Sequence, residues 1–132
     1  ANAIFSCHYA VANALVRGSV KPEHFTEECI RDPRTRALAD KITLAELPDV
    51  QRLGAELRVK LKDGREVAEL TVAPKGDCRL NPMSHDEIKS KFLDNVRFSR
   101  TIPEENVERL LGLLENVEKL DNVARIVELL VT

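Results

Sequence analysis

One stretch near the middle of the chain carries the alternating pattern of a β-hairpin. Leu57, Val59 and Leu61 alternate with charged residues, and they are followed by Asp63-Gly64, a pair typical of a two-residue type I′ turn. The return strand breaks strict alternation, which predicts a bulge near Ala68. We therefore expect an antiparallel hairpin with one buried face and one charged face.

Helical patterns precede this hairpin. Apolar residues recur at helical spacing over residues 5–16, with Ser6 placed to cap the start and Gly18 to end the helix. Asp32-Pro33 predicts a second helix start, because Asp caps well and proline needs no N–H at the first helical position.

Helical patterns also follow the hairpin. Ser84 and Glu87 form the S-x-x-E signature of a capping box, Pro103 opens a further helix, and Asp121 or Asn122 caps a last one. Helices, then strands, then helices indicate the α+β class. We expect a single domain over residues 1–132, in which a small antiparallel sheet with a central hairpin is packed by helices on one side and helices lie at both chain ends.

Composition excludes several classes of protein. A chain of 132 residues corresponds to one domain, and 43% hydrophobic residues argue against disorder. Lys and Arg number 20 against 22 Asp and Glu, with no basic block, so we expect no nucleic-acid partner. No apolar run is long enough for a membrane helix, so we expect no membrane partner either.

The cysteines and histidines predict neither a disulfide framework nor a metal site. Three widely spaced cysteines are typical of a reduced, cytoplasmic protein. The histidines stand singly, whereas metal ligands usually come in closely spaced pairs. We expect no metal and no cofactor.

Two short segments are candidates for ligand contact. His8 and Tyr9 lie among polar residues at an otherwise apolar helix start, and Lys75 lies in the turn Pro74-Lys75-Gly76-Asp77, of a kind that can hold an anion. Each of these residues also has a purely structural interpretation. Tyr9 can be a core residue, His8 can have no specific role, and Lys75 can lie in an ordinary turn. No P-loop, dinucleotide-binding or nucleophile-elbow motif is present, so no catalytic residue is assigned.

Several motifs together carry a resemblance to a known family. The motifs, in chain order, are Phe5-Ser6-x-x-Tyr9-Ala10-Val11-Ala12, Leu15-x-x-Gly18, Phe25-Thr26, Asp32-Pro33-x-x-x-Ala37-Leu38, Leu61-Lys62-Asp63-Gly64-Arg65, Pro74-Lys75-Gly76-Asp77, Asn81-Pro82-x-Ser84 and Lys91-Phe92. Their order is similar to that in the C-terminal domain of the MmgE/PrpD family. The resemblance covers essentially all 132 residues. The family includes 2-methylcitrate dehydratase, cis-aconitate decarboxylase and iminodisuccinate epimerase.

The resemblance implies a larger enzyme. Members are cofactor-independent, usually cytosolic homodimers that act on small di- or tricarboxylates, with the active site between two domains. The N-terminal helical domain, which supplies most acid–base residues, is absent here, and the start at Ala1 without methionine is expected to be a cut edge. Tyr9 falls on the motif tyrosine that reaches the substrate pocket. Cys7-His8 stands where Leu-Pro is commoner in the family, and an imidazole beside the pocket bears on the choice of substrate.

Three functions follow as hypotheses. The first is the C-terminal domain of a lyase or isomerase, contributing one wall of an interdomain site and inactive alone. The second is a standalone α+β interaction or assembly module without catalysis. The third is a small ligand-binding domain with a pocket of its own.

Overall fold

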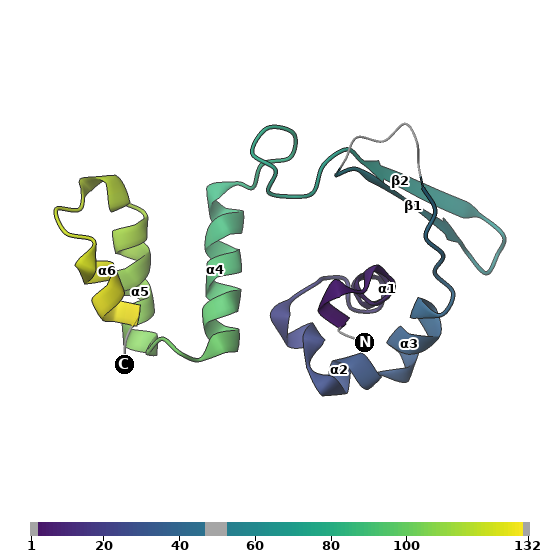
Figure 1. Cartoon of the computed structure of the whole chain (residues 1–132), viewed down its shortest axis with the longest axis horizontal. Coiled ribbons are helices and arrows are strands. Elements are labelled where there is room, and N and C mark those ends of the chain that lie inside the picture. Colours follow the sequence, from purple (N-terminus) through teal and green to yellow (C-terminus); the bar gives the residue numbers. More distant parts are fainter. Residues whose placement is uncertain (1–2, 47–52, 131–132) are drawn as a thin grey trace. The chain divides into compact units, whose positions relative to one another are not determined.

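The computed structural model describes residues 3–46 and 53–130 (Figure 1). Two compact units form, one from Ala1–Ile42 with Lys89–Thr132 and the other from Thr43–Ile88. The α-helices are α1 (Cys7–Arg17), α2 (Glu27–Arg31), α3 (Pro33–Ala39), α4 (His85–Ser99), α5 (Glu104–Leu114) and α6 (Ala124–Leu130). The strands are β1 (Ala55–Lys60) and β2 (Glu66–Thr71), and the 3-10 helices are η1 (Ala3–Phe5), η2 (Pro22–Phe25) and η3 (Val117–Lys119).

Helices α1 and α3 start where the sequence predicts, and α1 also ends there. The Ser6 hydroxyl accepts the Tyr9 N–H at 3.2 Å, and Gly18 ends α1 with a φ of 73°, a left-handed conformation that favours glycine. At the start of α3, Asp32 accepts the Arg34 N–H at 2.9 Å, and Pro33 occupies the first helical position. Both caps act within a few residues, which is why local sequence predicts them.

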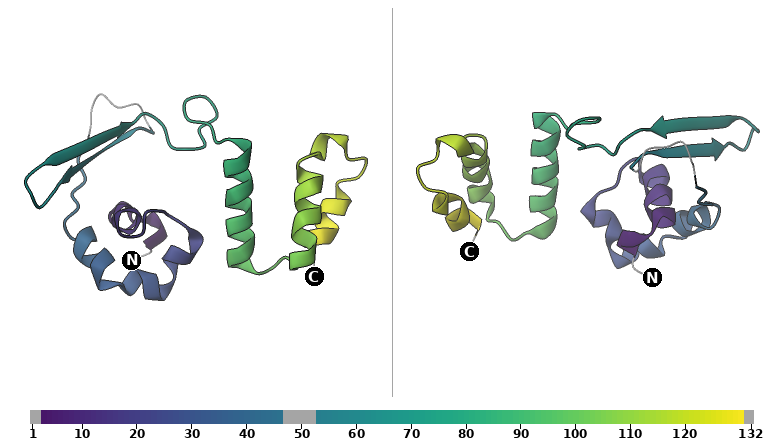
Figure 2. Two further views of the ribbon diagram at one scale, coloured as in Figure 1. Left: turned by 180° about the vertical axis from the view of Figure 1, so that it is seen from behind. Right: turned by 45° about the horizontal axis from the view of Figure 1, so that its top comes forward.

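Two of the later helices, α4 and α6, also begin at predicted N-terminal caps. The Ser84 N–H donates to the Glu87 carboxylate at 2.8 Å, and the Glu87 N–H donates back to the Ser84 hydroxyl at 3.2 Å, so the capping box is confirmed. Before α6, Asn122 accepts the Ala124 N–H at 2.9 Å. Figure 2 shows α5 and α6 side by side, and their contact buries Leu110 and Leu129.

The hairpin turn differs from the predicted two-residue turn. The Leu61 N–H donates to the Arg65 carbonyl at 2.8 Å, which leaves a three-residue loop, and Gly64 adopts a φ of 88°. Asp63 keeps a negative φ because its side chain accepts the Arg65 N–H at 3.1 Å and fixes an Asx-type turn. The turn therefore needs only one residue with a left-handed conformation, as in three-residue hairpin loops that combine a type I turn with a following glycine.

The predicted bulge near Ala68 is wrong, since pairing runs unbroken from Ala55↔Thr71 to Lys60↔Glu66. The apolar residues of β2 are instead divided between the two faces of the hairpin. Val67 lies opposite Val59 on one face, whereas Leu70 lies opposite Glu56 on the other.

The hairpin does not have the buried face that was expected. Val67 and Leu70 are 54% and 55% exposed, and every residue of β2 is exposed. The physical reason is that two strands offer too little surface for a core of their own. The α+β class itself is confirmed by the helices and the two-stranded antiparallel sheet. Within residues 3–46 and 53–130, no helix combines the length and apolarity needed to cross a bilayer.

Leu110 is the largest fully buried apolar side chain that the structure describes, at 1% exposure. Leu110→Ala removes buried methyl groups and leaves a cavity, so we expect the free energy of unfolding to fall by about 2–5 kcal/mol. Leu114→Ala on the same helix, at a residue 38% exposed, is the matched control and should cost under about 1 kcal/mol. Urea unfolding followed by circular dichroism measures both, and equal losses would contradict this core.

Candidate functional site

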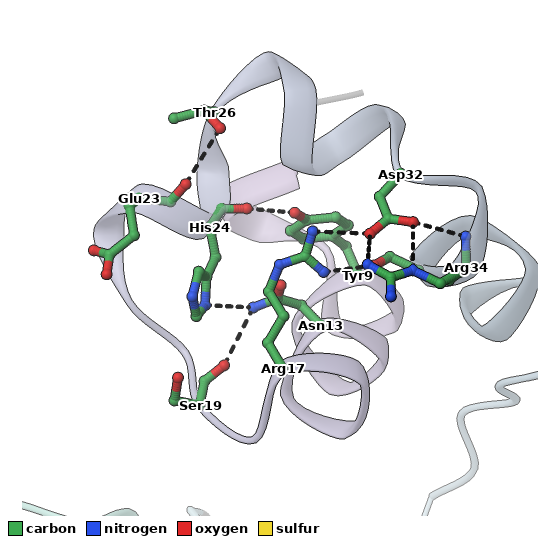
Figure 3. A network of polar contacts seen from close by, with 10 residues as sticks. Tyr9, Asn13, Arg17, Ser19, Glu23, His24, Thr26, Asp32 and Arg34 are labelled. Carbon is green, nitrogen blue, oxygen red and sulfur yellow. Dashed lines mark hydrogen bonds and ion pairs between the residues drawn. The ribbon is translucent and has the colours of Figure 1, made fainter.

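A row of three side chains on α1 organises a polar network (Figure 3). Tyr9, Asn13 and Arg17 follow one another at intervals of four residues, which places them along one side of the helix. Their partners lie in the following loop, in η2 and at the start of α3. The network therefore joins residues 6 to 18 positions apart in sequence.

Tyr9 is nearly buried, at 6% exposure, and its hydroxyl donates to the His24 carbonyl. Its ring packs against Phe25 with centroids 5.6 Å apart and planes tilted by 59°. Burial is the main cause that raises the pKa of the Tyr9 phenol above its usual value. The phenol is therefore a neutral hydrogen-bond donor across the ordinary pH range.

Asn13 is fully buried and ties the loop to α1. Its amide Nδ2 lies 3.4 Å from the Ser19 carbonyl and 3.3 Å from Nδ1 of His24. The Lys21 N–H also donates to that ring nitrogen at 3.3 Å, so Nδ1 of His24 serves as an acceptor. The Asn13 oxygen, in contrast, has no hydrogen-bond partner in the described part of the chain.

Arg17 connects α1 to α3. Its guanidinium donates to the Thr35 hydroxyl at 3.1 Å and to the Asp32 carboxylate at 3.0 Å, and Thr35 is fully buried. Asp32 also receives the Arg34 side chain at 2.9 Å. Hydrogen bonds from the Arg34 side chain and backbone, and then from Arg17, hold the pKa of the Asp32 carboxyl well below its usual range.

The sequence did not identify Asn13, Arg17, His24 or Thr35 as members of a network. One signal was available, because Asn13 and Arg17 continue the four-residue spacing from Tyr9. Their partners, however, are brought close only by tertiary folding.

His8 is not part of this network. It is half-buried, and no hydrogen bond joins its imidazole to another residue within the described ranges. Neighbours on a helix point about 100° apart, so the imidazole of His8 and the ring of Tyr9 lie on different sides of α1. Phe5, predicted on the apolar face of that helix, lies in η1 and is 84% exposed.

Lys75 lies in a loop that is closed by its own hydrogen bonds. Asn81 reaches the Ala73 carbonyl at 3.1 Å, and Asp77 accepts two backbone N–H groups at 2.9 Å. The Lys75 ammonium pairs with Glu87 at 3.0 Å. The N–H of Ser84 and then this ammonium lower the pKa of the Glu87 carboxyl. An incoming anion would therefore compete with Glu87 for Lys75.

The network satisfies most of its own polar groups, so its evident chemical role is to hold α1, η2 and α3 together. No three His, Cys, Asp or Glu side chains lie close enough to hold a metal ion within residues 3–46 and 53–130. Two acceptors in the network keep capacity for a further hydrogen bond: the Asn13 side-chain oxygen, which has no described partner, and the Tyr9 phenol oxygen, which donates to His24.

Asp32→Asn tests the electrostatic part of the network. Because the folded-state pKa lies below the ordinary value of 3.8, the charged carboxylate stabilises the folded chain above about pH 4, and this contribution is lost as the pH falls from there towards the folded-state pKa. We expect the variant to melt at a lower temperature than wild type at about pH 7, and the difference to shrink below about pH 4. Circular dichroism melts across this range measure it.

Arg36→Ala is the matched control, because it removes an arginine of α3 whose side chain has no described contact with Asp32 and leaves its backbone bond to Asp32 in place. Its effect on the melting temperature should not follow the same acid dependence. A deficit of Asp32→Asn that is equal at neutral and acid pH would refute the electrostatic account.

Comparison with known proteins gives a family for the chain. Residues 1–119 match the MmgE/PrpD C-terminal domain. The mitochondrial 2-methylcitrate dehydratase of Yarrowia lipolytica is 29% identical over 114 residues, which cover 79% of this chain and 22% of that protein. The chain thus spans about a fifth of the length of this curated relative. By the extent of the domain match, the chain belongs to the MmgE/PrpD family and corresponds to its C-terminal domain.

Proposed function

We propose that the chain is the C-terminal domain of a lyase or isomerase acting on small di- or tricarboxylates, similar to 2-methylcitrate dehydratase. The observation that carries this proposal is the match of residues 1–119 to the MmgE/PrpD C-terminal domain. In the proposal the domain supplies one wall of an active site whose other wall belongs to an N-terminal helical domain. The complete enzyme is a homodimer that needs no cofactor.

The chemistry of such a reaction explains why the chain by itself is proposed to be inactive. Removing a proton next to a carboxylate and expelling a leaving group requires a base, an acid and cationic groups that bind the carboxylates. In the α1 network the cations Arg17 and Arg34 are already held by Asp32. Tyr9 and His8 are the residues we propose to face the substrate.

The proposed compartment is the cytoplasm. All three cysteines are free thiols, in keeping with a reducing compartment. The Yarrowia relative is described as mitochondrial, which applies to that protein.

A second candidate is an interaction module without catalysis. The observation that favours it is the set of large apolar side chains left exposed, among them Phe5 at 84%, Ile4 at 65% and Val123 at 63%. Apolar surface of this kind commonly marks a contact with a partner. A domain that packs against another domain of a larger enzyme would expose the same surface. A measurement of enzymatic activity is therefore needed to distinguish the enzyme domain from the interaction module.

A chimera tests the enzymatic proposal. We expect the 132-residue chain alone to show no turnover of 2-methylcitrate, and to support turnover when it replaces the matched segment of the Yarrowia enzyme. The intact Yarrowia enzyme and the same enzyme lacking the segment are the controls. Turnover by the isolated chain contradicts the proposal that the chain is inactive by itself. A folded chimera that is inactive on every small di- and tricarboxylate tested favours the interaction module.

Tyr9→Phe in that chimera tests the proposed substrate contact. Loss of the hydrogen bond between the substrate and the phenol oxygen is expected to lower kcat/KM by up to about tenfold, while the free energy of unfolding falls by only about 1 kcal/mol through loss of the His24 contact. His8→Ala should change KM among carboxylates of different size. Cys7→Ser, at an exposed neighbouring position, is the control and should leave both constants unchanged. A Tyr9→Phe chimera with unchanged kcat/KM would make Tyr9 a purely structural residue.

A further inference from the structure

A half-open surface cavity of about 290 Å³ lies where α5 and α6 pack together, and Arg109, Gly112, Arg125 and Glu128 in its lining are exposed. Its lining is Arg109, Gly112 and Leu113 from α5, and Arg125, Glu128 and Leu129 from α6. In each helix these residues stand at positions i, i+3 and i+4, so each set forms one side of its helix. The two sides face the same cavity.

The two guanidinium groups in this lining have no partner. Neither the Arg109 nor the Arg125 side chain makes a hydrogen bond or ion pair with any residue in the described ranges. By contrast, Arg17, Arg34 and Arg58 are all held by carboxylates. With the Glu128 carboxylate included, two positive charges and one negative charge give the lining a net charge of +1.

Gly112 keeps the cavity open. A glycine inside a helix costs roughly 0.5–1 kcal/mol relative to alanine. Packing does not demand it, because a β-carbon added at Gly112 would have no neighbouring atom within 4 Å outside its own stretch of helix. The missing side chain leaves open space at a position that lines the cavity, where another residue would make α5 more stable.

We infer that this cavity binds a small organic polycarboxylate, with Arg109 and Arg125 on its carboxylate groups. Guanidinium groups recognise carboxylates by paired, charge-assisted hydrogen bonds. Leu113 and the buried Leu129 offer apolar contact to a short hydrocarbon backbone, which inorganic phosphate lacks. The cavity volume lies at the lower end of the range for small-molecule sites, about 300 Å³, so the ligand is small. This site shares no residue with the Tyr9 network and does not depend on the proposed function.

Titration of citrate into the ¹⁵N-labelled 132-residue chain, followed by NMR, tests the inference. We expect the amide shifts to concentrate at residues 109–113 and 125–129, and to weaken as salt screens the arginines. Arg109→Ala and Arg125→Ala should each weaken binding by at least about tenfold. Arg79→Ala, which removes an exposed arginine of the other unit, should leave binding unchanged.

Gly112→Leu separates a true cavity from general attraction of anions. It fills the space while keeping both arginines and improving helix propensity, so the variant should remain folded and lose citrate binding. Binding to Gly112→Leu equal to that of wild type overturns the inference. The inference is also overturned if Arg79→Ala weakens citrate binding as much as Arg109→Ala and Arg125→Ala do. It is overturned as well if inorganic phosphate shifts the amide signals of residues 109–113 and 125–129 and citrate does not.

Discussion

The Asp32 carboxylate is the group on which the first three α-helices depend. It caps α3 through the Arg34 N–H, and the same carboxylate receives Arg17 from α1. Helices of five and seven residues, such as α2 and α3, are not stable alone in water and need tertiary contacts. Because Thr35 and Asn13 are buried beside this link, their polar groups would be costly without the partners that Arg17 and the loop provide.

Most polar groups inside the α1 network have hydrogen-bond partners, whereas many apolar side chains outside it are exposed. The α1 network buries hydroxyl, amide and guanidinium groups with partners for nearly all of them. Meanwhile Phe5, Leu15 and Val20 remain exposed in the same part of the chain, as do apolar residues on both faces of the hairpin. Burying such groups against a further domain would recover about 25 cal/mol for each Å² of apolar surface, which is consistent with the proposed two-domain enzyme.

The parts of this fold that the sequence predicts are those with short-range causes. Ser6, Asp32 and the pair Ser84 and Glu87 bond to backbone groups two or three residues away, so each helix start is evident locally. The hairpin was predicted at its correct place, but its turn type depends on the bond between Asp63 and Arg65, which a two-letter turn rule does not include. The α1 network was missed because Arg17 meets Thr35 only after 18 residues of intervening chain have folded back.

The hydrogen bond of Tyr9 restricts what this residue can do in the proposed enzyme. Its hydroxyl proton is committed to the His24 carbonyl, and burial raises the pKa of the phenol. To donate a proton to a substrate, Tyr9 would have to give up that bond and leave a carbonyl without its donor, at a cost of about 1–3 kcal/mol. Accepting a hydrogen bond on the phenol oxygen costs nothing comparable. A substrate hydroxyl or protonated carboxyl is therefore the partner that Tyr9 favours, which makes it a positioning group and leaves proton transfer to residues of the other domain.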